Sequence, residues 1–205
     1  MTAWHLDARH FIANKDLSES GWLTARQGKI TATLIAKAST RSGFDEALAQ
    51  IIEPPPPIDD NAYMEFGRRM EPEIALWLKD EWGIMPNAWL IRHPDRPEYV
   101  ATPDGIHLST PLIAEIKTTG KDWETYRQVP IQYRRQVQWQ LYVTGADTCV
   151  FAWMLRAESA GRMVPAWMEP RQVVVERDDK YIKDLLATAE QLLERKEKHH
   201  ATVQS

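Results

Sequence analysis

The chain has 205 residues, of which 43% are hydrophobic and 26% are charged, the balance of an ordinary soluble globular protein. This length supports one substantial core, and we expect a single folded domain over residues 1–205. No apolar run reaches the ~18–20 residues of a membrane span, and the first ten residues lack the apolar segment of a signal peptide. We therefore expect a cytoplasmic protein with no membrane contact.

The charge and cysteine content narrow the function further. A formal net charge of −4 argues against a protein that simply coats nucleic acid. It leaves a nuclease open, because carboxylates gathered at a metal site lower the total charge. Cys149 is the only cysteine, so the chain forms no internal disulfide and no cysteine cluster for a metal ion.

Helical patterns dominate the first eighty residues. In the longest of them apolar side chains recur at i, i+4 and i+8, and Gly83 is expected to end the helix. Pro72 predicts a kink or a fresh helix start near Glu71. Residues Pro54 to Pro57 cannot continue a helix and predict an exposed, stiff linker. The expected helices are Thr31–Ala38, Asp45–Ile52 and Asp60–Trp82.

Strand patterns follow in the second half of the chain. Short runs of β-forming residues separated by Pro, Asp and Gly predict a meander of about three strands, which a helix, two further strands and a terminal helix follow. This order predicts an α/β fold with a mixed, twisted central sheet flanked by helices. The expected strands are Trp89–Arg92, Tyr99–Thr102, Leu112–Lys117, Cys149–Leu155 and Gln172–Val175, and the expected helices are Ile131–Val143 and Asp178–Lys198.

The segment from Asp104 to Lys117 carries the chemistry. A hard divalent cation such as Mg²⁺ prefers oxygen ligands, usually one or two carboxylates together with water and phosphate. Asp104 ends one predicted strand before a glycine turn, and Glu115 lies in the next strand. If the two strands form a hairpin, the two carboxylates meet.

The triplet Glu115-Ile116-Lys117 adds a cation to these carboxylates. Residues i and i+2 of a strand project to the same face, so Glu115 and Lys117 point the same way while Ile116 points into the opposite layer. The carbonyl of Ile116 remains available as a further oxygen ligand. A lysine beside two carboxylates and a metal ion orients or deprotonates a water, or stabilises developing negative charge, and phosphodiester hydrolysis needs these parts.

A second interpretation is open for each of these residues. The pattern Asp followed by Glu-x-Lys is common, and two charged surface turns produce it as well. Against this, the triplet follows the apolar run 112–114, where unpaired charges are costly. Elsewhere, Arg26 fits a solvated surface charge, and Glu71 fits the first turn of a helix, where the helix dipole favours a carboxylate. Gln136 and Gln140 share a helix face that fits solvent contact.

The chain resembles the phage lambda exonuclease and YqaJ-type viral recombinase nucleases of the PD-(D/E)xK superfamily. The resemblance runs in order over most of the length and includes the Thr-Pro-Asp-Gly and Glu-x-Lys pair. Ordered blocks at compatible spacing are far more specific than any one block. The other blocks are 22–43 (Trp-Leu-Thr-Ala-Arg-Gln-Gly-Lys-Ile-Thr-Ala-Thr, then Arg-Ser-Gly), 67–75 (Gly-Arg-Arg-Met-Glu-Pro-Glu-Ile-Ala), 136–144 and 174–181.

The resemblance implies a PD-(D/E)xK restriction-endonuclease-like core and a role for each matching residue. It makes Asp104 and Glu115 the metal-binding carboxylates, with the Ile116 carbonyl, and Lys117 the catalytic lysine. By the same resemblance, the metal site is completed by Glu71 and Gln136. The 5′-phosphate or the duplex is contacted by Arg26, Thr33, Thr102 and Arg41.

The resemblance also implies the reaction and the partners. It implies a Mg²⁺-dependent 5′→3′ exonuclease, with Mn²⁺ also suited to oxygen ligands, that digests one strand of double-stranded DNA from its ends and leaves a 3′ single strand for recombination. It further implies a ring-shaped homotrimer, a single-strand annealing protein as partner, and a phage or prophage origin in a bacterial host. The alternatives are a PD-(D/E)xK endonuclease of restriction or repair type and an inactive DNA-binding or scaffold protein.

Overall fold

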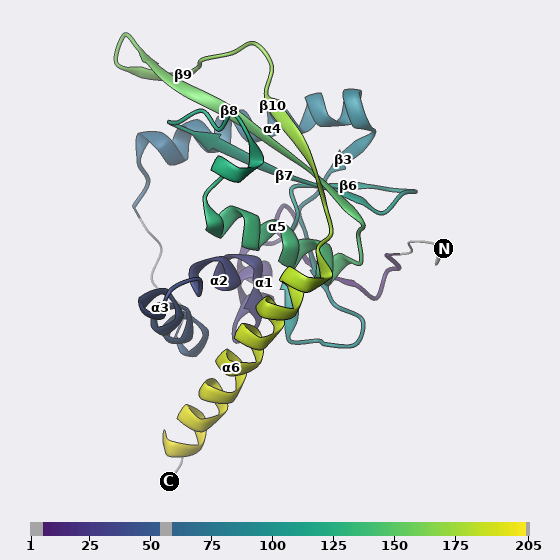
Figure 1. Cartoon of the computed structure of the whole chain (residues 1–205), viewed down its shortest axis with the longest axis vertical. Helices are drawn as coiled ribbons and strands as arrows, with labels where there is room; N and C mark the ends of the chain where they lie inside the picture. Colours follow the sequence, from purple (N-terminus) through teal and green to yellow (C-terminus); the bar gives the residue numbers. More distant parts are fainter. Residues whose placement is uncertain (1–5, 54–58, 204–205) are drawn as a thin grey trace.

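The computed structural model describes residues 6–53 and 59–203 and is drawn in Figure 1. Helices and strands are distributed over the whole of this length. They are β1 (Phe11–Asn14), α1 (Glu19–Arg26), β2 (Ile30–Thr31), α2 (Ala32–Lys37), α3 (Arg41–Ile52), α4 (Ala62–Trp82), β3 (Ile84–Pro86), β4 (Trp89–Arg92), β5 (Tyr99–Ala101), β6 (Gly105–His107), β7 (Leu112–Thr119), the 3-10 helix η1 (Tyr126–Gln128), α5 (Ile131–Thr144), β8 (Thr148–Ser159), β9 (Arg162–Pro165), β10 (Arg171–Glu176) and α6 (Asp179–Val203).

The larger sheet is mixed and has the strand order β10-β8-β7-β6-β3, with β9 paired to β8. Strands β7 and β8 are parallel, from Leu112 opposite Thr148 to Thr119 opposite Leu155, and the other pairs are antiparallel. The β8–β9 hairpin extends past the rest of this sheet (Figure 1). The predicted α/β class with a mixed, twisted sheet flanked by helices is confirmed.

A second sheet corrects the predicted meander. Strands β4 and β5 belong to a four-stranded sheet of order β1-β4-β5-β2, whereas β6 and β7 belong to the larger sheet. The break between the two sheets falls at residues 102–104, between β5 and β6. Pro103 has no N–H to donate to a sheet ladder, which explains why the pairing of β5 does not continue through this segment.

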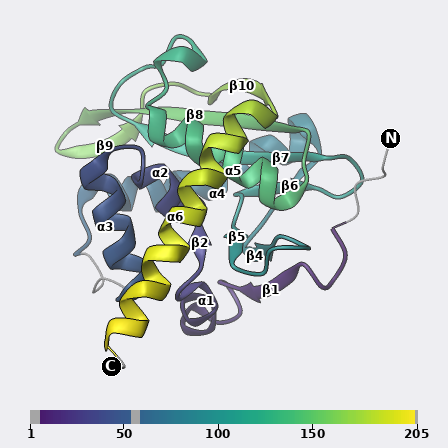
Figure 2. The same cartoon turned by 60° about the horizontal axis from the view of Figure 1, so that its bottom comes forward.

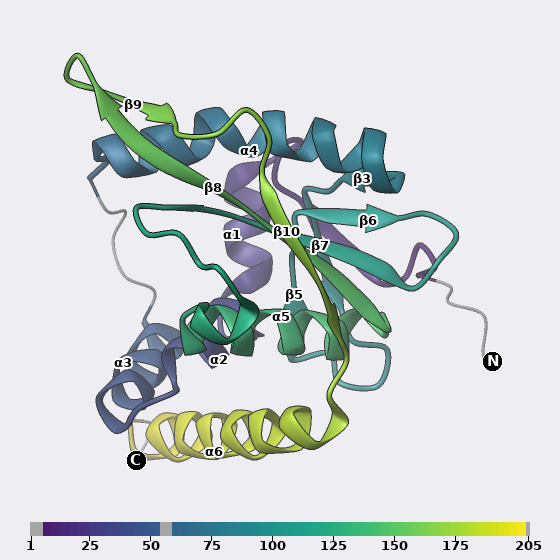
Figure 3. The same cartoon turned by 45° about the horizontal axis from the view of Figure 1, so that its top comes forward.

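Helices cover both faces of the larger sheet, as Figure 3 shows. Helix α4 packs its buried side chains, among them Phe66, Ile74 and Leu78, on Ala114 and Ile116 of β7. Helix α5 covers the opposite face, and α2 and α6 pack against the far side of α5. Strand β7 therefore lies between two helices, with one face toward each.

Helix α4 runs without interruption through Pro72, so the alternative of a fresh helix start near Glu71 is wrong. Pro72 is exposed. Water can therefore bind the carbonyl four residues earlier, whose hydrogen bond proline cannot make. The helix ends as predicted at Gly83, which adopts the left-handed conformation with φ 67°.

Helix α5 is the centre of the molecule. It contacts β8, the strands β4 and β5 of the smaller sheet, and the helices α2 and α6. The guanidinium of Arg135 donates to the carbonyls of Ile35 at 2.8 Å and Ala38 at 3.4 Å, at the end of α2. These bonds satisfy carbonyls that a helix C-terminus leaves unpaired, and they fasten α2 to α5.

Helix α6 crosses the outside of the molecule diagonally beside α3 (Figure 2). Its buried face includes Ile182, Leu185 and Ala189, as the apolar stripe in the sequence predicts. No helix in the described ranges 6–53 and 59–203 is long and apolar enough to cross a membrane. The linker predicted at residues 54–57 lies outside the described residues.

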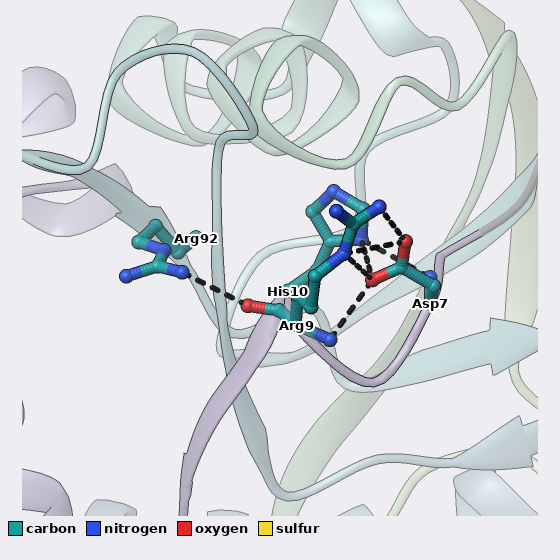
Figure 4. A network of polar contacts seen from close by, with 4 residues as sticks. All are labelled: Asp7, Arg9, His10 and Arg92. Atoms are coloured by element: carbon teal, nitrogen blue, oxygen red, sulfur yellow. Dashed lines mark hydrogen bonds and ion pairs between the residues drawn. The ribbon is translucent and has the colours of Figure 1, made fainter.

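Polar contacts hold the first described segment against β4 (Figure 4). The carboxylate of Asp7 accepts hydrogen bonds from the guanidinium of Arg9, the closest at 2.6 Å, and from the Arg9 backbone N–H at 2.9 Å. Arg92 of β4 donates from its guanidinium to the Arg9 carbonyl at 3.1 Å and from its N–H to the His10 carbonyl at 2.8 Å. These bonds extend the pairing of β1 with β4 toward the N-terminus.

Candidate active site

The β6–β7 hairpin brings Asp104 and Glu115 together. Asp104 immediately precedes β6, and its N–H donates to the carbonyl of Ala114 at 3.0 Å. Its carboxylate Oδ2 accepts from the N–H of Ile116 at 2.7 Å. The sequence predicted a hairpin between these carboxylates, but the partner strand of β7 follows Asp104 rather than preceding it.

The charged and the apolar side chains of β7 lie on opposite faces of the strand, as predicted. Ala114 and Ile116 point into the apolar cluster under α4. Glu115 and Lys117 point to the other face, where Glu115 bonds to Gln140 and Lys117 lies over the ring of Tyr133, both on α5. One eight-residue strand thus contributes to the core on one face and to a polar cluster on the other.

The carboxylate of Glu115 is almost fully buried, with 1% of its surface exposed. Its Oε1 forms an ion pair with the ammonium of Lys117, and its Oε2 accepts a hydrogen bond from Gln140 Nε2 at 2.7 Å. The ammonium of Lys117 lies 5.2 Å from the centroid of the Tyr133 ring. Both oxygens of this carboxylate are therefore held by specific donors.

Burial and mutual repulsion shape the electrostatics of this cluster. Burial, and then the nearby charge of Glu115, raise the pKa of Asp104 well above its ordinary value, with a smaller contribution from Glu71. Burial alone would lower the pKa of Lys117, but Glu115 and Asp104 outweigh it and raise that pKa above the ordinary value. Lys117 is therefore a charged donor beside two carboxylates, and it is suited to stabilising negative charge.

Glu71 approaches the cluster from the α4 side of the sheet. A Cβ added at Gly67 would lie 3.5 Å from Oγ1 of Thr118 and 3.8 Å from Oε1 of Glu71, so both side chains lie beside this glycine. Glu71 itself is exposed, and its charge is close enough to raise the pKa of Asp104. Carboxylates therefore lie on both faces of β7, Glu115 on the α5 side and Glu71 on the α4 side.

Gln136 makes no hydrogen bond to the carboxylates of the cluster among the described residues. It is half-buried and lines a cavity of about 460 Å³ together with Thr33, Lys37 and Tyr133. Gln140, one helical turn further along α5, makes the contact with Glu115 instead. Tyr133 and Gln140 were not singled out as site residues from the sequence. Their spacing of seven residues, which places two side chains on one helix face, is the signal that finds them.

Arg26 and Thr33 line a second, smaller cavity of about 250 Å³. The guanidinium of Arg26 lies 4.0 Å from the centroid of the Trp22 ring, and burial lowers its pKa to about 10, so it remains charged at neutral pH. Thr33 is exposed and lines both cavities. It therefore connects the surroundings of Arg26 with those of Gln136 and Tyr133.

The other two expected DNA contacts differ in burial. The hydroxyl of Thr102 is buried and has no hydrogen-bond partner among the described residues. Arg41 is the exposed first residue of α3 and lines neither of the two cavities. The structure thus brings Asp104, Glu115 and Lys117 together, places Glu71 beside them, and leaves Arg41 exposed on the surface.

The donor set at the edge of β7 fits a hard divalent cation. Within the ranges 6–53 and 59–203, no three His, Cys, Asp or Glu side chains converge closely enough to hold a metal ion by themselves. A cation that keeps water ligands needs only one or two carboxylates, and Asp104 and Glu115 supply two. Because the N–H and C=O of a strand residue point to the same side, the Ile116 carbonyl faces the side on which Asp104 lies.

A mixed sheet that presents two carboxylates and a lysine from a hairpin, between a helix on each face, defines the class. The fold is that of the lambda-exonuclease-like PD-(D/E)xK nucleases. Residues 21–147 match the family described as the YqaJ-like viral recombinase domain, and the chain belongs to this family. The resemblance seen in the sequence is therefore confirmed.

Solved structures support this assignment. An alkaline exonuclease from Laribacter hongkongensis, LHK-Exo, is 25% identical with a TM-score of 0.68, and the match covers 90% of this chain and 96% of that chain. LHK-Exo in complex with dAMP gives 26% identity and a TM-score of 0.69 over 90% and 95% of the two chains. A phage-related exonuclease from Haemophilus somnus 129PT, 13% identical over 85% of this chain and 96% of its own, shares the fold with a TM-score of 0.66. No curated protein matches the chain.

Proposed function

We propose that this protein is a Mg²⁺-dependent exonuclease that digests one strand of double-stranded DNA from the 5′ end and leaves a 3′ single strand for recombination. The observation that carries the proposal is the cluster of Asp104, Glu115 and Lys117 on β7 and just before β6, in which Glu115 is buried and paired with Lys117. Membership of the YqaJ-like viral recombinase family and the likeness to LHK-Exo support the same reaction. We place the activity in the cytoplasm of a bacterial host, where phage or prophage DNA would be its substrate.

Each residue of the cluster has a separate task. Asp104, Glu115 and the Ile116 carbonyl would hold Mg²⁺, or Mn²⁺ in its place. When bound, the cation polarises the phosphate and lowers the pKa of a water molecule. Lys117 holds its positive charge beside the scissile phosphate, where negative charge develops. We assign Glu71 and Gln136 to the completion of this site from α4 and α5.

The decisive experiment compares DNA forms. End-labelled linear duplex and closed circular duplex are incubated with the protein in Mg²⁺ and in chelator. We expect loss of the linear DNA in Mg²⁺, an intact circle, and no reaction in chelator. Cleavage of the circle would instead favour an endonuclease of the same class, and no cleavage of either form in Mg²⁺ or Mn²⁺ would favour an inactive DNA-binding protein.

The 5′ end of the DNA defines a second part of the proposal. We assign the terminal 5′-phosphate to Arg26, with the hydroxyls of Thr33 and Thr102, and a contact with the duplex to Arg41. A guanidinium offers two hydrogen bonds to a phosphate, so duplexes with a 5′-phosphate should be digested faster than those with a 5′-hydroxyl. Arg26→Ala should erase this difference. Arg41→Ala is the matched control, and it should weaken binding equally for both ends.

The third part of the proposal is a ring-shaped homotrimer that encloses the duplex. A ring explains how a chain with net charge −4 stays on DNA, since its inner surface can be basic while the outside is acidic. Trp4, Trp22 and Trp167 are the proposed apolar contacts between subunits. Trp22 and Trp167 are half-buried beneath Arg26 and Arg171, and Trp4 lies outside the described residues. Sedimentation at working concentration tests the trimer, and a monomeric mass would contradict it.

The fourth part is a protein partner, a single-strand annealing protein that captures the 3′ strand. Its proposed docking site is residues 158–170, where the β8–β9 hairpin and the following loop expose Met168 completely. The other candidate segment, residues 54–57, lies outside the described part of the chain. A pull-down with the annealing protein encoded beside this gene, at moderate salt and without DNA, should recover both proteins. Failure to do so would reject the complex and leave the nuclease proposal standing.

A further inference from the structure

A contribution to folding stability does not explain why position 140 of the cluster is a glutamine. It lies in the middle of α5 between Trp139 and Leu141, and none of its surface is exposed. Its Nε2 donates to Glu115, but its Oε1 is buried and has no hydrogen-bond partner among the described residues. A buried polar atom without a partner destabilises the folded state by about 1–3 kcal/mol. An apolar side chain of the same length would avoid this cost.

The direction of the Gln140 amide follows from its neighbour. An ionised carboxylate only accepts hydrogen bonds, so the NH₂ group and not the carbonyl must face Glu115. The amide is also neutral, so it holds the carboxylate without adding a charge to a cluster that already contains Lys117. The 2.7 Å bond to Oε2 and the ion pair on Oε1 together fix the carboxylate in one orientation.

Gln138, two residues earlier on the same helix, provides the contrast. It is also buried, with 6% of its surface exposed. Its Nε2 donates to the carbonyl of Glu176 at 2.8 Å, and its Oε1 accepts from the N–H of Asp178 at 2.8 Å. Both ends of this amide are satisfied by backbone, and they tie α5 to the connection between β10 and α6. Gln138 is thus explained by stability alone, whereas Gln140 is not.

We infer that Gln140 is a positioning residue that holds the Glu115 carboxylate in the orientation needed to bind the divalent cation. A carboxylate offers about four acceptor sites. Lys117 and Gln140 occupy one on each oxygen, which leaves the remaining sites of Glu115 for the cation. The inference deepens the proposed function and rests on it, because it takes Glu115 as a cation ligand.

The test compares the same substitution at the two glutamines. Gln140→Met and Gln138→Met each replace an amide by an apolar side chain of similar length on the same helix. For each variant we would measure Mn²⁺ affinity by calorimetry without DNA, turnover on 5′-phosphorylated duplex at saturating metal, and Tm. Partners that orient a metal ligand typically contribute tenfold to a hundredfold to metal affinity or activity. We therefore expect Gln140→Met to weaken Mn²⁺ binding by about ten- to a hundredfold and to lower turnover.

Gln138→Met should behave in the opposite way. It leaves a carbonyl and an N–H of the β10–α6 connection without their partner, so Tm should fall while Mn²⁺ affinity stays at the wild-type value. In Gln140→Met the loss of the donor to Glu115 and the removal of the unpartnered Oε1 act in opposite directions on Tm. If Gln140→Met does not fold, Gln140→Leu takes its place in the same measurements.

Two outcomes separate the inference from the proposed function. If the wild type binds Mn²⁺ and cleaves DNA, but the variant at position 140 matches it in both, the positioning role of Gln140 is overturned and the nuclease stands. If the wild type neither binds Mn²⁺ nor cleaves DNA, the proposed function fails and the inference fails with it. Asp104→Ala serves as the reference for a site that has lost its cation.

Discussion

Two aspartates in this protein experience opposite environments. Asp7, in the first described segment, is partly exposed and paired with Arg9 (Figure 4), and that side-chain hydrogen bond lowers its pKa to about 2. Asp104 receives one hydrogen bond, from Ile116, and burial together with Glu115 raises its pKa well above the ordinary value. The fold favours the ionised form of the first carboxyl group and opposes that of the second.

This contrast separates two uses of charge. At Asp7 the ionised carboxylate contributes to the fold, because its partners bind the charged form. At Asp104 the ionised carboxylate opposes the fold, and such a group is retained where a ligand or a reaction requires it. The contrast therefore predicts that substitutions around Asp104 change activity far more than stability, and that substitutions elsewhere do the reverse.

The largest effect is expected for Lys117→Ala. Removing one group that stabilises the charge of a transition state lowers turnover by about a hundred- to a thousandfold. Metal binding should persist because Asp104 and Glu115 remain, whereas Asp104→Ala should lose both metal binding and cleavage. Turnover of labelled linear duplex and Mn²⁺ calorimetry measure the two properties. Lys117→Ala activity within about tenfold of wild type, roughly 1.4 kcal/mol of barrier, would contradict the catalytic role.

The apolar face behind the site should show the reverse behaviour. Ile74 of α4 is 1% exposed and packs in the cluster that contains Ile116. Ile74→Ala should lower the free energy of unfolding by about 2–5 kcal/mol, because it removes buried methyl groups and leaves a cavity. Turnover per folded molecule should stay near the wild-type value. Urea unfolding and activity at low temperature check both statements, and a large loss of turnover without a loss of stability would reverse the comparison.

A smaller effect of opposite sign is expected for Asp104→Asn. The amide keeps the shape of the side chain and can still accept from the Ile116 N–H, but it removes a charge that burial and Glu115 oppose. In chelator at pH 9, far above the ordinary pKa of an aspartate, Tm should rise by about 2–4 °C, the shift that ~1 kcal/mol produces in a protein of this size. A fall in Tm under these conditions would show that the carboxylate stabilises the fold.

The smallest effect is expected for Asp7→Asn. The pair with Arg9 is solvent-exposed, and such pairs contribute little to stability. Because the pKa of Asp7 is lowered, its contribution is present above the ordinary value of 3.8 and is lost as the pH falls through about 2. Thermal scans should show a change of about 1 °C or less at pH 7 and a smaller change near pH 2. A change that grows toward pH 2 would have the wrong sign.

The sequence predicts elements whose own residues carry a strong period. Helix α6 and strand β4 lie close to their expected bounds, and α6 shows the clear apolar stripe that the sequence predicts. Helix α1 has no buried residue, so no apolar stripe reveals it. Strand β2 has two residues and gains its identity only from parallel pairing with β5. Such elements depend on distant partners that a local pattern does not contain.

The site shows the same limit. The pairing of Asp104 with Glu115 and the shared face of Glu115 and Lys117 follow from local spacing, and both are predicted from the sequence. Gln136 and Gln140 share one helix face, and spacing alone does not say which of them lies opposite Glu115. That choice depends on where along its length α5 crosses β7, which the packing of the two layers decides. The role of Gln136 stays a prediction.

If the 5′-phosphate binds beside Thr33 as proposed, the bonds from Arg135 to the last carbonyls of α2 affect the size of the product. Thr33 lies on α2, and Tyr133 and Gln140, which contact Lys117 and Glu115, lie on α5. A phosphate held beside Thr33 would therefore sit at a constant separation from the bond that is cut. The joined helices would fix the distance between the bound phosphate and the bond that is cut, so that every round of hydrolysis shortens the strand by the same number of nucleotides.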